Sequence, residues 1–289
     1  MQMQATKLTY RRGDTGQEVR RLQKKIGVAG DGVFGRKTQE AVKKYQGDNA
    51  LAIDGIAGPK TLGSLGLDTF YGIDVSHWNG NVRWGSVDQV DCQFVWAKMS
   101  QGRDHYDKSR EHNLDGCRSN GIPIGGYHFP SPHIGMSSND PKLEVEQFLR
   151  ALGPIQPGDM LPVLDLEAGV KGDPDHNRQW ALEWLREFEN ETGQRCIIYT
   201  AKWYTYSYLK GDVGDLKNYP LWVANYTRGE DRNKLDRIEP KHLCGWDDWS
   251  AWQWTGSGHI EGLGETGIRK CDRNIIPGGC AAFNELVVK

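Results

Sequence analysis

Apolar and polar positions follow two different patterns along this chain, and from residue 70 onward the two patterns alternate. Short apolar runs of strand length are separated by stretches in which apolar residues recur at helical spacing. The helical stretches lie near 109–119, 142–152 and 176–191, and the last has Trp180, Trp184 and Phe188 on one face. Such alternation predicts a parallel α/β barrel, irregular toward its end, where helices between strands are less evident. The expected strands are 70–75, 94–97, 122–129, 160–166, 196–199, 221–224 and 251–254.

The first 69 residues contain helical stripes and no strand-like runs. Thr15-x-x-Glu18 has the form of a capping box ahead of Val19 and Leu22, which predicts a first helix. Ala41, Val42 and Tyr45 form a second stripe, and Leu62 with Leu65 a third. These stripes predict a small all-α three-helix bundle.

An internal repeat lies within this bundle. Asp31-Gly-Val-Phe-Gly-Arg-Lys-Thr38 returns 23 positions later as Asp54-Gly-Ile-Ala-Gly-Pro-Lys-Thr61. Asp-Gly favours a tight turn, and we expect the second glycine of each copy to adopt a positive φ at the bend before a helix. Pro59 suits a first helical turn. The repeat either serves binding or only builds the bundle. It is not a phosphate loop, because Arg36 separates Gly35 from Lys37.

Composition and charge support a division of the chain into two parts. The 289 residues are 37% hydrophobic and 26% charged, as in soluble globular proteins, and the net charge of −2 gives no indication of nucleic acid or of an anionic membrane surface. Residues 1–69 carry 12 Lys or Arg and 7 Asp or Glu, whereas the remainder carries 24 and 31. All 11 tryptophans lie in the second part. We therefore expect two domains with different tasks.

Targeting and redox signals are few. Residues 1–7 lack the apolar segment of a secretory signal, and no apolar run approaches the ~20 residues of a membrane span. We therefore expect synthesis in the host cytoplasm and no stable insertion into a membrane. The six cysteines show no C-x-x-C spacing, and we expect them to be buried free thiols.

Acidic residues stand where apolar runs of the second part end. Asp74 ends the first run, Asp165 and Glu167 end another, and Asp272 follows the last. Asp165 and Glu167 are two apart on a strand, so their side chains point to the same side. Carboxylates crowded into one pocket raise the pKa of at least one of them. Cleavage of a glycosidic bond requires one protonated carboxyl group and one carboxylate.

Other readings of these acids remain open at this point. An aspartate at a strand end is often a turn former or a helix cap, and a carboxylate cluster also suits Mg²⁺ or Ca²⁺. No dedicated metal loop and no H-E-x-x-H motif is present in the sequence, so we expect neither a metal nor another cofactor.

Aromatic residues near the expected strand ends favour a carbohydrate substrate. Trp and Tyr offer a flat apolar surface with a polar handle, which suits the apolar faces of sugar rings. The residues concerned are Trp78, Tyr127, Trp222, Tyr226, Trp252 and Trp254.

The first part resembles the peptidoglycan-binding domain 1 family over residues 6–67. The resemblance is carried by Gly13-x-x-Gly16-x-x-Val19-x-x-Leu22-Gln23, by Asp31-Gly-x-Phe-Gly35-x-x-Thr38-x-x-Ala41-Val42-x-x-Tyr45-Gln46, and by Asp54-Gly55 followed by Gly58-x-x-Thr61. It implies a non-catalytic anchor that binds bacterial peptidoglycan.

The second part, 70–289, resembles the family-25 glycoside hydrolases, the Chalaropsis-type lysozymes. The motifs occur in the family's order: Gly72-Ile-Asp-Val-Ser-His-Trp78, Gly125-Gly-Tyr-His-Phe129, Leu164-Asp-Leu-Glu167, Ile198-Tyr-Thr200, Leu221-Trp-Val-Ala-Asn-Tyr226, Trp252-Gln-Trp254 and Asp272-x-Asn274. The resemblance implies a modified (β/α)₅β₃ barrel. It also implies hydrolysis of the β-1,4 bond between N-acetylmuramic acid and N-acetylglucosamine.

Roles follow from the resemblance residue by residue. Glu167 matches the general acid/base, Asp165 the acid that orients the substrate's N-acetyl group, and Asp74 and Asp272 the supporting acids. The expected substrate contacts are Tyr127, Tyr199, Trp222, Tyr226, Gln253, Trp254 and Trp78. Arg273 stands where the family has a neutral residue, and the segment 230–248 is long and charged.

The sequence therefore predicts a monomeric peptidoglycan hydrolase of the endolysin type, which acts on the wall after the membrane is breached. Net retention at the anomeric carbon is expected, and direct inversion by water stays open. The rivals are a non-catalytic glycan-binding protein, a chitinase-like enzyme and a wall amidase or peptidase.

Overall fold

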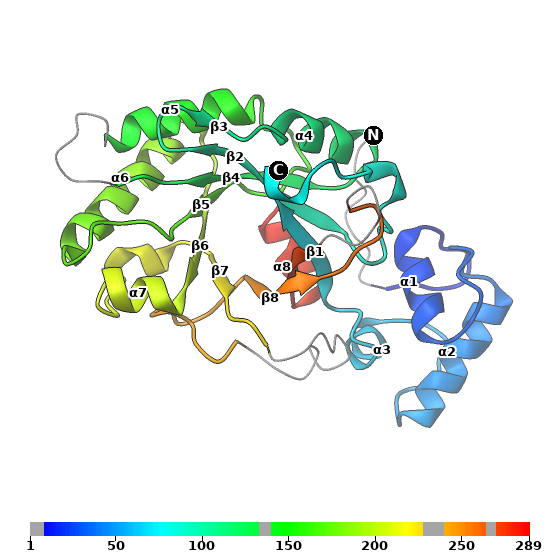
Figure 1. Ribbon diagram of the computed structural model, residues 1–289. Helices are drawn as coiled ribbons and strands as arrows, with labels where there is room; N and C mark the ends of the chain where they lie inside the picture. The colour runs from blue at the N-terminus through cyan, green and yellow to red at the C-terminus, as the bar shows by residue number, and fades with distance from the viewer. Residues whose placement is uncertain (1–8, 133–139, 228–239, 264–269) are drawn as a thin grey trace.

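Two regions with separate hydrophobic cores make up the protein, as the computed structural model shows (Figure 1). The structure describes residues 9–132, 140–227, 240–263 and 270–289. Residues 1–7 and most of the charged segment 230–248 therefore lie outside the described residues. In the described part, no helix is long and apolar enough to cross a membrane.

The first region is the three-helix bundle predicted from the sequence, formed by α1 (Gln17–Lys25), α2 (Arg36–Asp48) and α3 (Pro59–Ser64). The stripe residues Val19, Leu22 and Val42 point inward and are fully buried. Short antiparallel bridges tie Tyr10 to Ala57 and Thr15 to Val33. The core consists of Tyr10, Val19, Leu22, Phe34, Val42, Ala57, Leu65 and Leu67.

The repeat builds the same hydrogen-bonded unit twice around a buried glutamine. Gln46 Nε2 donates to Asp54 Oδ1 at 2.9 Å, to the Ile56 carbonyl at 3.0 Å and to Thr61 Oγ1 at 3.1 Å, while its Oε1 accepts from Gly55 N at 2.9 Å. In the first copy Gln23 makes the corresponding four bonds. The repeated Asp, Gly and Thr are therefore the partners of a glutamine one helix earlier.

Two local predictions for this region are wrong. The first glycine of each copy takes the positive φ, 75° at Gly32 and 72° at Gly55, because the Asp-Gly turn itself needs it. The second glycine, Gly35 or Gly58, is the extended N-cap of the next helix. The capping box also does not form, since α1 begins after Gly16 without a side-chain cap.

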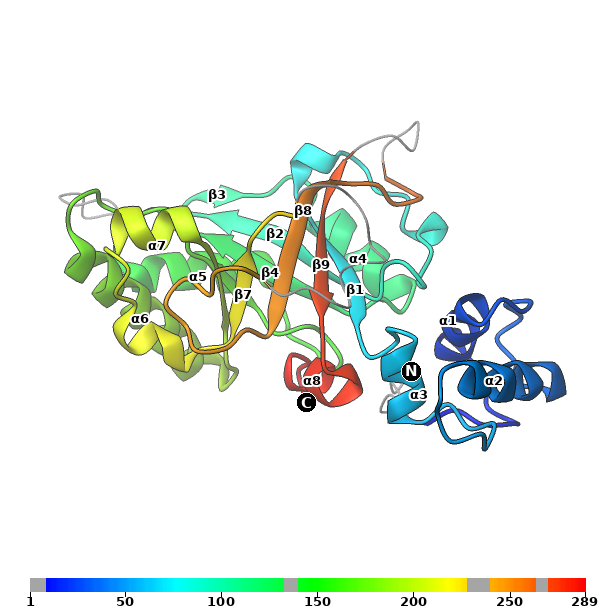
Figure 2. The same ribbon diagram turned by 90° about the horizontal axis from the view of Figure 1, so that it is seen from below.

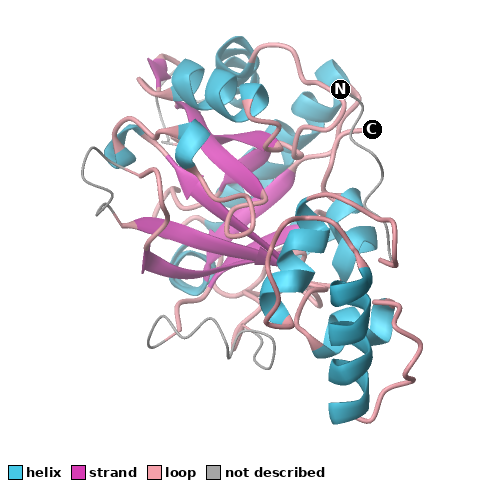
Figure 3. Ribbon diagram, turned by 90° about the vertical axis from the view of Figure 1, so that its right-hand side faces the viewer, coloured by secondary structure: helices cyan, strands magenta, loops and turns pink. Residues whose placement is uncertain are grey.

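The second region is a closed barrel of eight strands surrounded by helices, which confirms the predicted fold (Figure 3). Its strands are β1 (Phe70–Val75), β2 (Phe94–Gln101), β4 (Ile124–Phe129), β5 (Val163–Asp165), β6 (Ile197–Ala201), β7 (Leu221–Ala224), β8 (Ala251–Gly258) and β9 (Cys271–Ile276). Neighbouring strands are parallel except at β9, which runs antiparallel to both β8 and β1. The short β3 (His105–Tyr106) extends the sheet beyond β2.

Helices occupy the connections between the first strands. They are α4 (Arg110–Ser119), α5 (Pro141–Leu152), α6 (Pro174–Thr192) and α7 (Lys202–Tyr208), with short 3₁₀ turns η1 (His77–Asn79), η2 (Trp84–Ser86) and η3 (Gly214–Asn218). The pattern predicted α4, α5 and α6 but not α7, whose sequence is rich in aromatic and β-branched residues. It also missed β9, so Asp272 lies within a strand and not after one.

Alternation along the strands creates two cores. Outward-facing residues such as Ile73, Val95 and Trp252 pack against the helices. Inward-facing residues such as Phe94, Trp96 and Ile197 fill the barrel at the end where the parallel strands begin. Helix α8 (Gly279–Glu285) closes that end, with the Phe283 ring stacked on Phe70 at 4.2 Å. The opposite end of the barrel, where the parallel strands finish, is the one left for polar side chains.

The bundle contacts the barrel through α1 and lies beside α8 (Figure 2). Arg21 is buried between the two regions, where it pairs with Glu18 at 2.9 Å and donates to the Thr69 carbonyl at 2.7 Å. Its guanidinium lies 5.6 Å from the centre of the Phe70 ring. Lys24 pairs with Asp88 of the barrel at 3.0 Å.

Candidate active site

All four predicted acids converge at the carboxyl end of the barrel. They line one cavity of about 160 Å³, which also contains five of the seven predicted substrate contacts. The lining residues are Asp74, Tyr127, Asp165, Glu167, Tyr199, Trp222, Tyr226, Gln253 and Asp272. Seven different strands or strand ends supply them, so the closed barrel is what brings them together.

Strand register explains how residues far apart in sequence meet here. Asp74 on β1 is the direct partner of Asp272 on β9, and because β9 is antiparallel, its first residues lie at the end where β1 finishes. Asp165 is the last residue of β5. Glu167 follows two positions later, and the backbone bond from Leu166 N to the Tyr199 carbonyl, 2.8 Å, keeps this segment beside β6.

A hydrogen-bond network connects the walls of the cavity. Gln253 Oε1 accepts from the hydroxyl groups of Tyr199 at 2.9 Å and Tyr226 at 3.0 Å, and its Nε2 donates to Asp74 Oδ2 at 2.9 Å. Asn274 Nδ2 donates to the same oxygen at 2.8 Å and its Oδ1 accepts from Trp222 Nε1 at 2.9 Å. We did not predict Asn274 as a site residue, although it stands two positions after Asp272 and therefore faces the same side.

Burial and mutual repulsion raise the pKa of these acids. For Glu167 the largest cause is burial, which raises the pKa; a hydrogen bond with Tyr199 opposes it, and the negative charge of Asp272 raises the pKa further. Burial is also the first cause of the raised pKa of Asp74; the charge of Asp272 adds to it, and the bonds from Asn274 and Gln253 oppose it. A proton is therefore retained within the cluster at a pH at which isolated carboxyl groups are ionised.

Asp165 has one carboxyl oxygen that is not satisfied by the protein residues described. Its Oδ1 is buried and has no hydrogen-bond partner within the described part of the chain. Burial, followed by the charge of Glu167, raises the pKa of Asp165, whereas the ammonium of Lys98 on β2 lowers it. Lys98 is a further residue of the site that the sequence did not indicate.

The tryptophans divide by the side of the strand on which they lie. Trp222 faces inward and stacks on Trp96 with ring centres 4.3 Å apart. Trp252 and Trp254 flank the inward-facing Gln253 on β8, so they face outward and are buried in the core beneath the helices. Trp254 is therefore not the substrate contact that we predicted, and Trp252 does not offer its ring to a sugar in this cavity.

The structure also shows where the side chains of Trp78 and Arg273 lie relative to the cavity. Trp78 lies on η1, just beyond the end of β1, and its side chain is 79% exposed, outside the cavity lining. Arg273 lies between Asp272 and Asn274 and therefore faces outward, where it donates to the His259 and Asp91 carbonyls. The unusual charge at that position does not reach the cavity.

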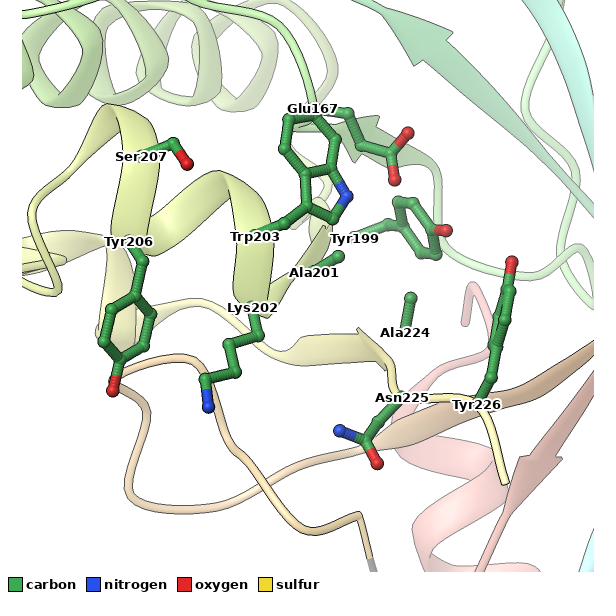
Figure 4. A pocket seen from close by; sticks show the side chains of 10 residues that line it. All are labelled: Glu167, Tyr199, Ala201, Lys202, Trp203, Tyr206, Ser207, Ala224, Asn225 and Tyr226. Atoms are coloured by element: carbon green, nitrogen blue, oxygen red, sulfur yellow. The ribbon is translucent and has the colours of Figure 1, made fainter. Parts of the chain in front are cut away.

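A second, larger cavity of about 620 Å³ opens from the first along α7 (Figure 4). Glu167, Tyr199 and Tyr226 line both cavities, so the two are continuous. The new contributions come from α7 and the end of β7: Ala201, Lys202, Trp203, Tyr206, Ser207, Ala224 and Asn225. Because α7 was not predicted, neither was this extension.

The described part of the chain contains no cluster of side chains arranged as a metal centre. Among residues 9–132, 140–227, 240–263 and 270–289, no group of three or more His, Cys, Asp or Glu side chains is placed to hold an ion.

Comparison with known protein families accounts for both regions. The sequence model of "Glycosyl hydrolases family 25" matches residues 73–263, and that of "Putative peptidoglycan binding domain" matches residues 15–65. The chain belongs to glycosyl hydrolases family 25. The match ends before β9. Asp272 and Asn274 therefore lie outside the matched residues, and the pairing of β9 with β1 brings them beside the other acids.

Curated relatives of this family-25 chain include lysozymes. "Lysozyme M1" of Streptomyces globisporus is 26% identical over 236 residues, covering 78% of this chain and 74% of the relative. The "Uncharacterized protein YegX" of Escherichia coli K12 is 29% identical over 200 residues. That match covers 68% of this chain and 66% of the relative, slightly less than two thirds of its length.

Solved structures share the barrel. A bacterial lysozyme from Streptomyces coelicolor superposes with a TM-score of 0.64 at 24% identity, covering 75% of this chain and 96% of that one. The spore cortex lytic enzyme SleM of Clostridium perfringens gives a TM-score of 0.61 at 25% identity, covering 76% and 70%. Each of these matches covers about three quarters of the chain, which is about the length of the barrel region.

Proposed function

We propose that this family-25 chain is an N-acetylmuramidase that cleaves the β-1,4 bond between N-acetylmuramic acid and N-acetylglucosamine in bacterial peptidoglycan. The observation that carries the proposal is the convergence of Asp74, Asp165, Glu167 and Asp272 in one cavity, in which burial raises the pKa of each and repulsion adds to it for the first three. Such a cluster holds a proton and a negative charge side by side, as glycoside hydrolysis requires.

Glu167 serves as the general acid. It lies where the small cavity meets the larger one, so a glycosidic oxygen can approach its carboxyl group at this junction. Its raised pKa keeps the carboxyl group protonated, and its proton passes to the glycosidic oxygen as the bond from that oxygen to the anomeric carbon breaks. The resulting carboxylate then takes a proton from the water that completes hydrolysis.

Asp165 orients the substrate's N-acetyl group. Its buried Oδ1 lacks a partner among the described residues and is available to accept the acetamido N–H. This contact aligns the acetamido oxygen for attack on the anomeric carbon, and water later opens the ring so formed, with net retention. Proton NMR of the first product distinguishes retention from direct inversion by its anomer.

The remaining polar groups hold this arrangement. The charge of Asp272 helps to raise the pKa of Glu167, and Asp74 is the supporting acid paired with Asp272. Gln253 fixes the hydroxyl groups of Tyr199 and Tyr226. With Tyr127 and Trp222 these residues line the sugar site, and Trp78 offers an exposed ring at its rim.

The bundle serves as an anchor to the same polymer. The match to a peptidoglycan-binding family over residues 15–65 supports this assignment, as does the net positive charge of the first 69 residues. Because Arg21 and Lys24 hold α1 against the barrel, binding of the bundle keeps the catalytic cavity close to glycan.

Product analysis tests the proposed activity. Purified peptidoglycan is digested, reduced with borohydride and examined by mass spectrometry, with undigested wall as the control. We expect new reduced ends on muramic acid. New reduced ends on N-acetylglucosamine would indicate a chitinase-like specificity, and new free amines would indicate an amidase or peptidase. If no products form, the protein would be a glycan-binding protein without hydrolase activity.

We further propose an endolysin role, in which the enzyme is made in the cytoplasm and reaches the wall after membrane breach. The cysteines support synthesis in a reducing compartment, because five buried cysteines are free thiols: Cys92, Cys117, Cys196, Cys244 and Cys271. Cells that express the protein should lyse only when a membrane-permeabilising agent is added. Lysis without that agent would contradict this role and leave the muramidase assignment intact.

A further inference from the structure

The cavity along α7 differs in chemistry from the acid cavity that it joins. Among the described residues that line it, Glu167 is the one acid and Lys202 the one cation. Figure 4 shows Glu167, Tyr199 and Tyr226 toward one end, while Lys202 and Tyr206 extend from α7 toward the other. A substrate that reaches from Glu167 along α7 therefore moves from a negative field to a positive one.

Lys202 is held in place by contacts that, among the described residues, include no acid. Its Nζ donates to His242 Nε2 at 3.1 Å and lies 5.2 Å from the centre of the Tyr206 ring. No ion pair of Lys202 is found in the part of the chain that the structure describes, whereas Lys24, Lys44, Lys142 and Lys217 there each pair with a carboxylate. A fixed ammonium that has no ion pair among the described residues is suited to bind an anionic group of a ligand.

Two aromatic rings accompany this cation. Trp203 and Tyr206 are one helical turn apart on α7, and their side chains are 51% and 62% exposed. Large apolar rings exposed along a cavity that leads from the acids offer a stacking surface for a sugar ring or a peptide. The cavity thus combines a flat apolar surface with a single positive charge.

We propose that this cavity takes the lactyl side of the muramic acid whose N-acetyl group Asp165 orients, and that Lys202 binds a carboxylate carried by that lactyl substituent. The inference rests on the proposed muramidase function. N-acetylmuramic acid differs from N-acetylglucosamine by an ether-linked lactyl group, which ends in a free carboxylate or in a stem peptide with carboxylates of its own. Charge complementarity with Lys202 distinguishes the two sugars, so Lys202 is a specificity-determining residue.

Steady-state kinetics on three substrates tests the proposal, with the wild type, Lys202→Met and Lys202→Arg compared. Met preserves the length of the side chain and removes the charge, and Arg restores the charge. The substrates are intact solubilised peptidoglycan, the same material with its carboxyl groups chemically amidated, and glycan strands whose peptides have been removed. Lys210→Met is the matched control, because Lys210 is exposed at the end of α7 and lies outside the cavity lining.

The expected result is a rise in KM of about 3- to 10-fold for Lys202→Met on a carboxylate-bearing substrate, with little change in kcat, since a partly exposed charge pair contributes modest binding energy. Arg should recover most of the loss. An effect on intact peptidoglycan alone identifies a stem-peptide carboxylate, and an effect on peptide-free strands alone identifies the lactyl carboxylate.

Two results would overturn the inference. One is an equal rise in KM on amidated peptidoglycan, which would mean that the effect of Lys202 does not depend on a carboxylate of the substrate. The other is a KM for Lys202→Met that matches that of Lys210→Met on every substrate. If the wild type itself releases no muramic acid ends, the proposed function fails, and that outcome is visible before any variant is examined.

Discussion

Aspartates are used in opposite ways in the bundle and in the barrel. In the bundle, Asp31 and Asp54 accept from backbone N–H groups of their own turns and from Gln23 or Gln46, and these bonds lower the pKa of both carboxyl groups. In the barrel, Asp74 and Asp165 are buried beside other acids, and the pKa of each is raised. In the first pair Oδ1 of each carboxylate accepts two hydrogen bonds, whereas the second contains a buried carboxyl oxygen with no partner among the described residues.

The contrast separates acids that build a fold from acids that are available for chemistry. A carboxylate that receives several hydrogen bonds stabilises its turn and has little capacity left for a ligand. A crowded and poorly satisfied carboxylate costs stability, and such a cost is typical of functional sites. The sequence motifs D-G in the bundle and Asp165-x-Glu167 in the barrel look equally acidic, and only their partners distinguish them.

The largest effect should follow from removing the proton donor. Glu167→Gln is expected to lower kcat on peptidoglycan by about 10³-fold or more, because the leaving oxygen loses its acid while the cavity keeps its shape. Turbidity loss of purified walls measures this. Glu146→Gln, on the outer helix α5, is the matched control and should behave as wild type.

Wall binding by the Glu167→Gln variant is measured in the same experiment. Glu167→Gln should still be pulled down by purified walls, since the bundle is unchanged. A variant that lyses walls at the wild-type rate would contradict the assignment of the acid, and loss of pull-down would contradict the division of tasks between the two regions.

An intermediate effect is expected from the buried glutamines of the bundle. Gln46→Ala removes the shared partner of Asp54, Gly55, Ile56 and Thr61, and should destabilise the bundle by about 2 to 4 kcal/mol. Chemical denaturation measures this loss, and wall pull-down should weaken with it. Glu40→Ala, which removes only an exposed ion pair on α2, should cost less than about 0.5 kcal/mol.

The catalytic site allows a check on that variant. Since the barrel has its own cores, Gln46→Ala should retain kcat on short soluble glycan fragments, which do not require the anchor. Loss of kcat on such fragments would show that the bundle supports the barrel through Arg21, and the two regions would then have to be treated as one unit.

The smallest effect concerns stability and its pH dependence. Because the pKa of Asp165 is raised in the folded protein, its favourable contribution is present below its unfolded pKa and is lost as the pH rises through the folded pKa. At neutral pH Asp165→Asn should therefore stabilise the barrel by about 1 kcal/mol, or roughly 2 to 4 °C in Tm. The gain should vanish near pH 4, where the wild-type carboxyl group is protonated.

The bundle should respond to pH with the opposite sign. The lowered pKa of Asp54 means that its contribution to stability is present above its unfolded pKa and is lost as the pH falls through the folded pKa. Thermal unfolding from pH 3 to pH 8 measures both trends. A lower Tm for Asp165→Asn at neutral pH would refute the contrast between the two kinds of acid.

Much of the barrel could be predicted because its strands are apolar on both faces, as buried parallel strands are. Phe70–Val75 and Leu221–Ala224 were predicted with the bounds that the structure gives. The four acids could be predicted to meet because each belongs to the carboxyl end of the barrel, a place fixed by topology and independent of loop detail.

The errors arise where period-two alternation was not applied or where local preference was misleading. Gln253 and Trp254 are adjacent on β8 and cannot both face the cavity, so naming both as substrate contacts was inconsistent with strand geometry. Alternation also identifies Asn274 once Asp272 is accepted. By contrast, α7 begins Lys-Trp-Tyr-Thr, a poor helical sequence that tertiary packing overrides, and Trp203 could not be placed without it.

The pairing of Asp74 with Asp272 has a consequence for the synthesis of the enzyme. Asn274 and Gln253, which hold Asp74, are 200 and 179 residues away from it in sequence, and β9 closes the barrel against β1. Contacts of such long range form late, since the entropy of closing a long loop must be overcome first. A nascent chain therefore lacks the closing strand and one of its four acids until residues 271–276 have been made. The hydrolase completes its active site as one of the last steps of folding.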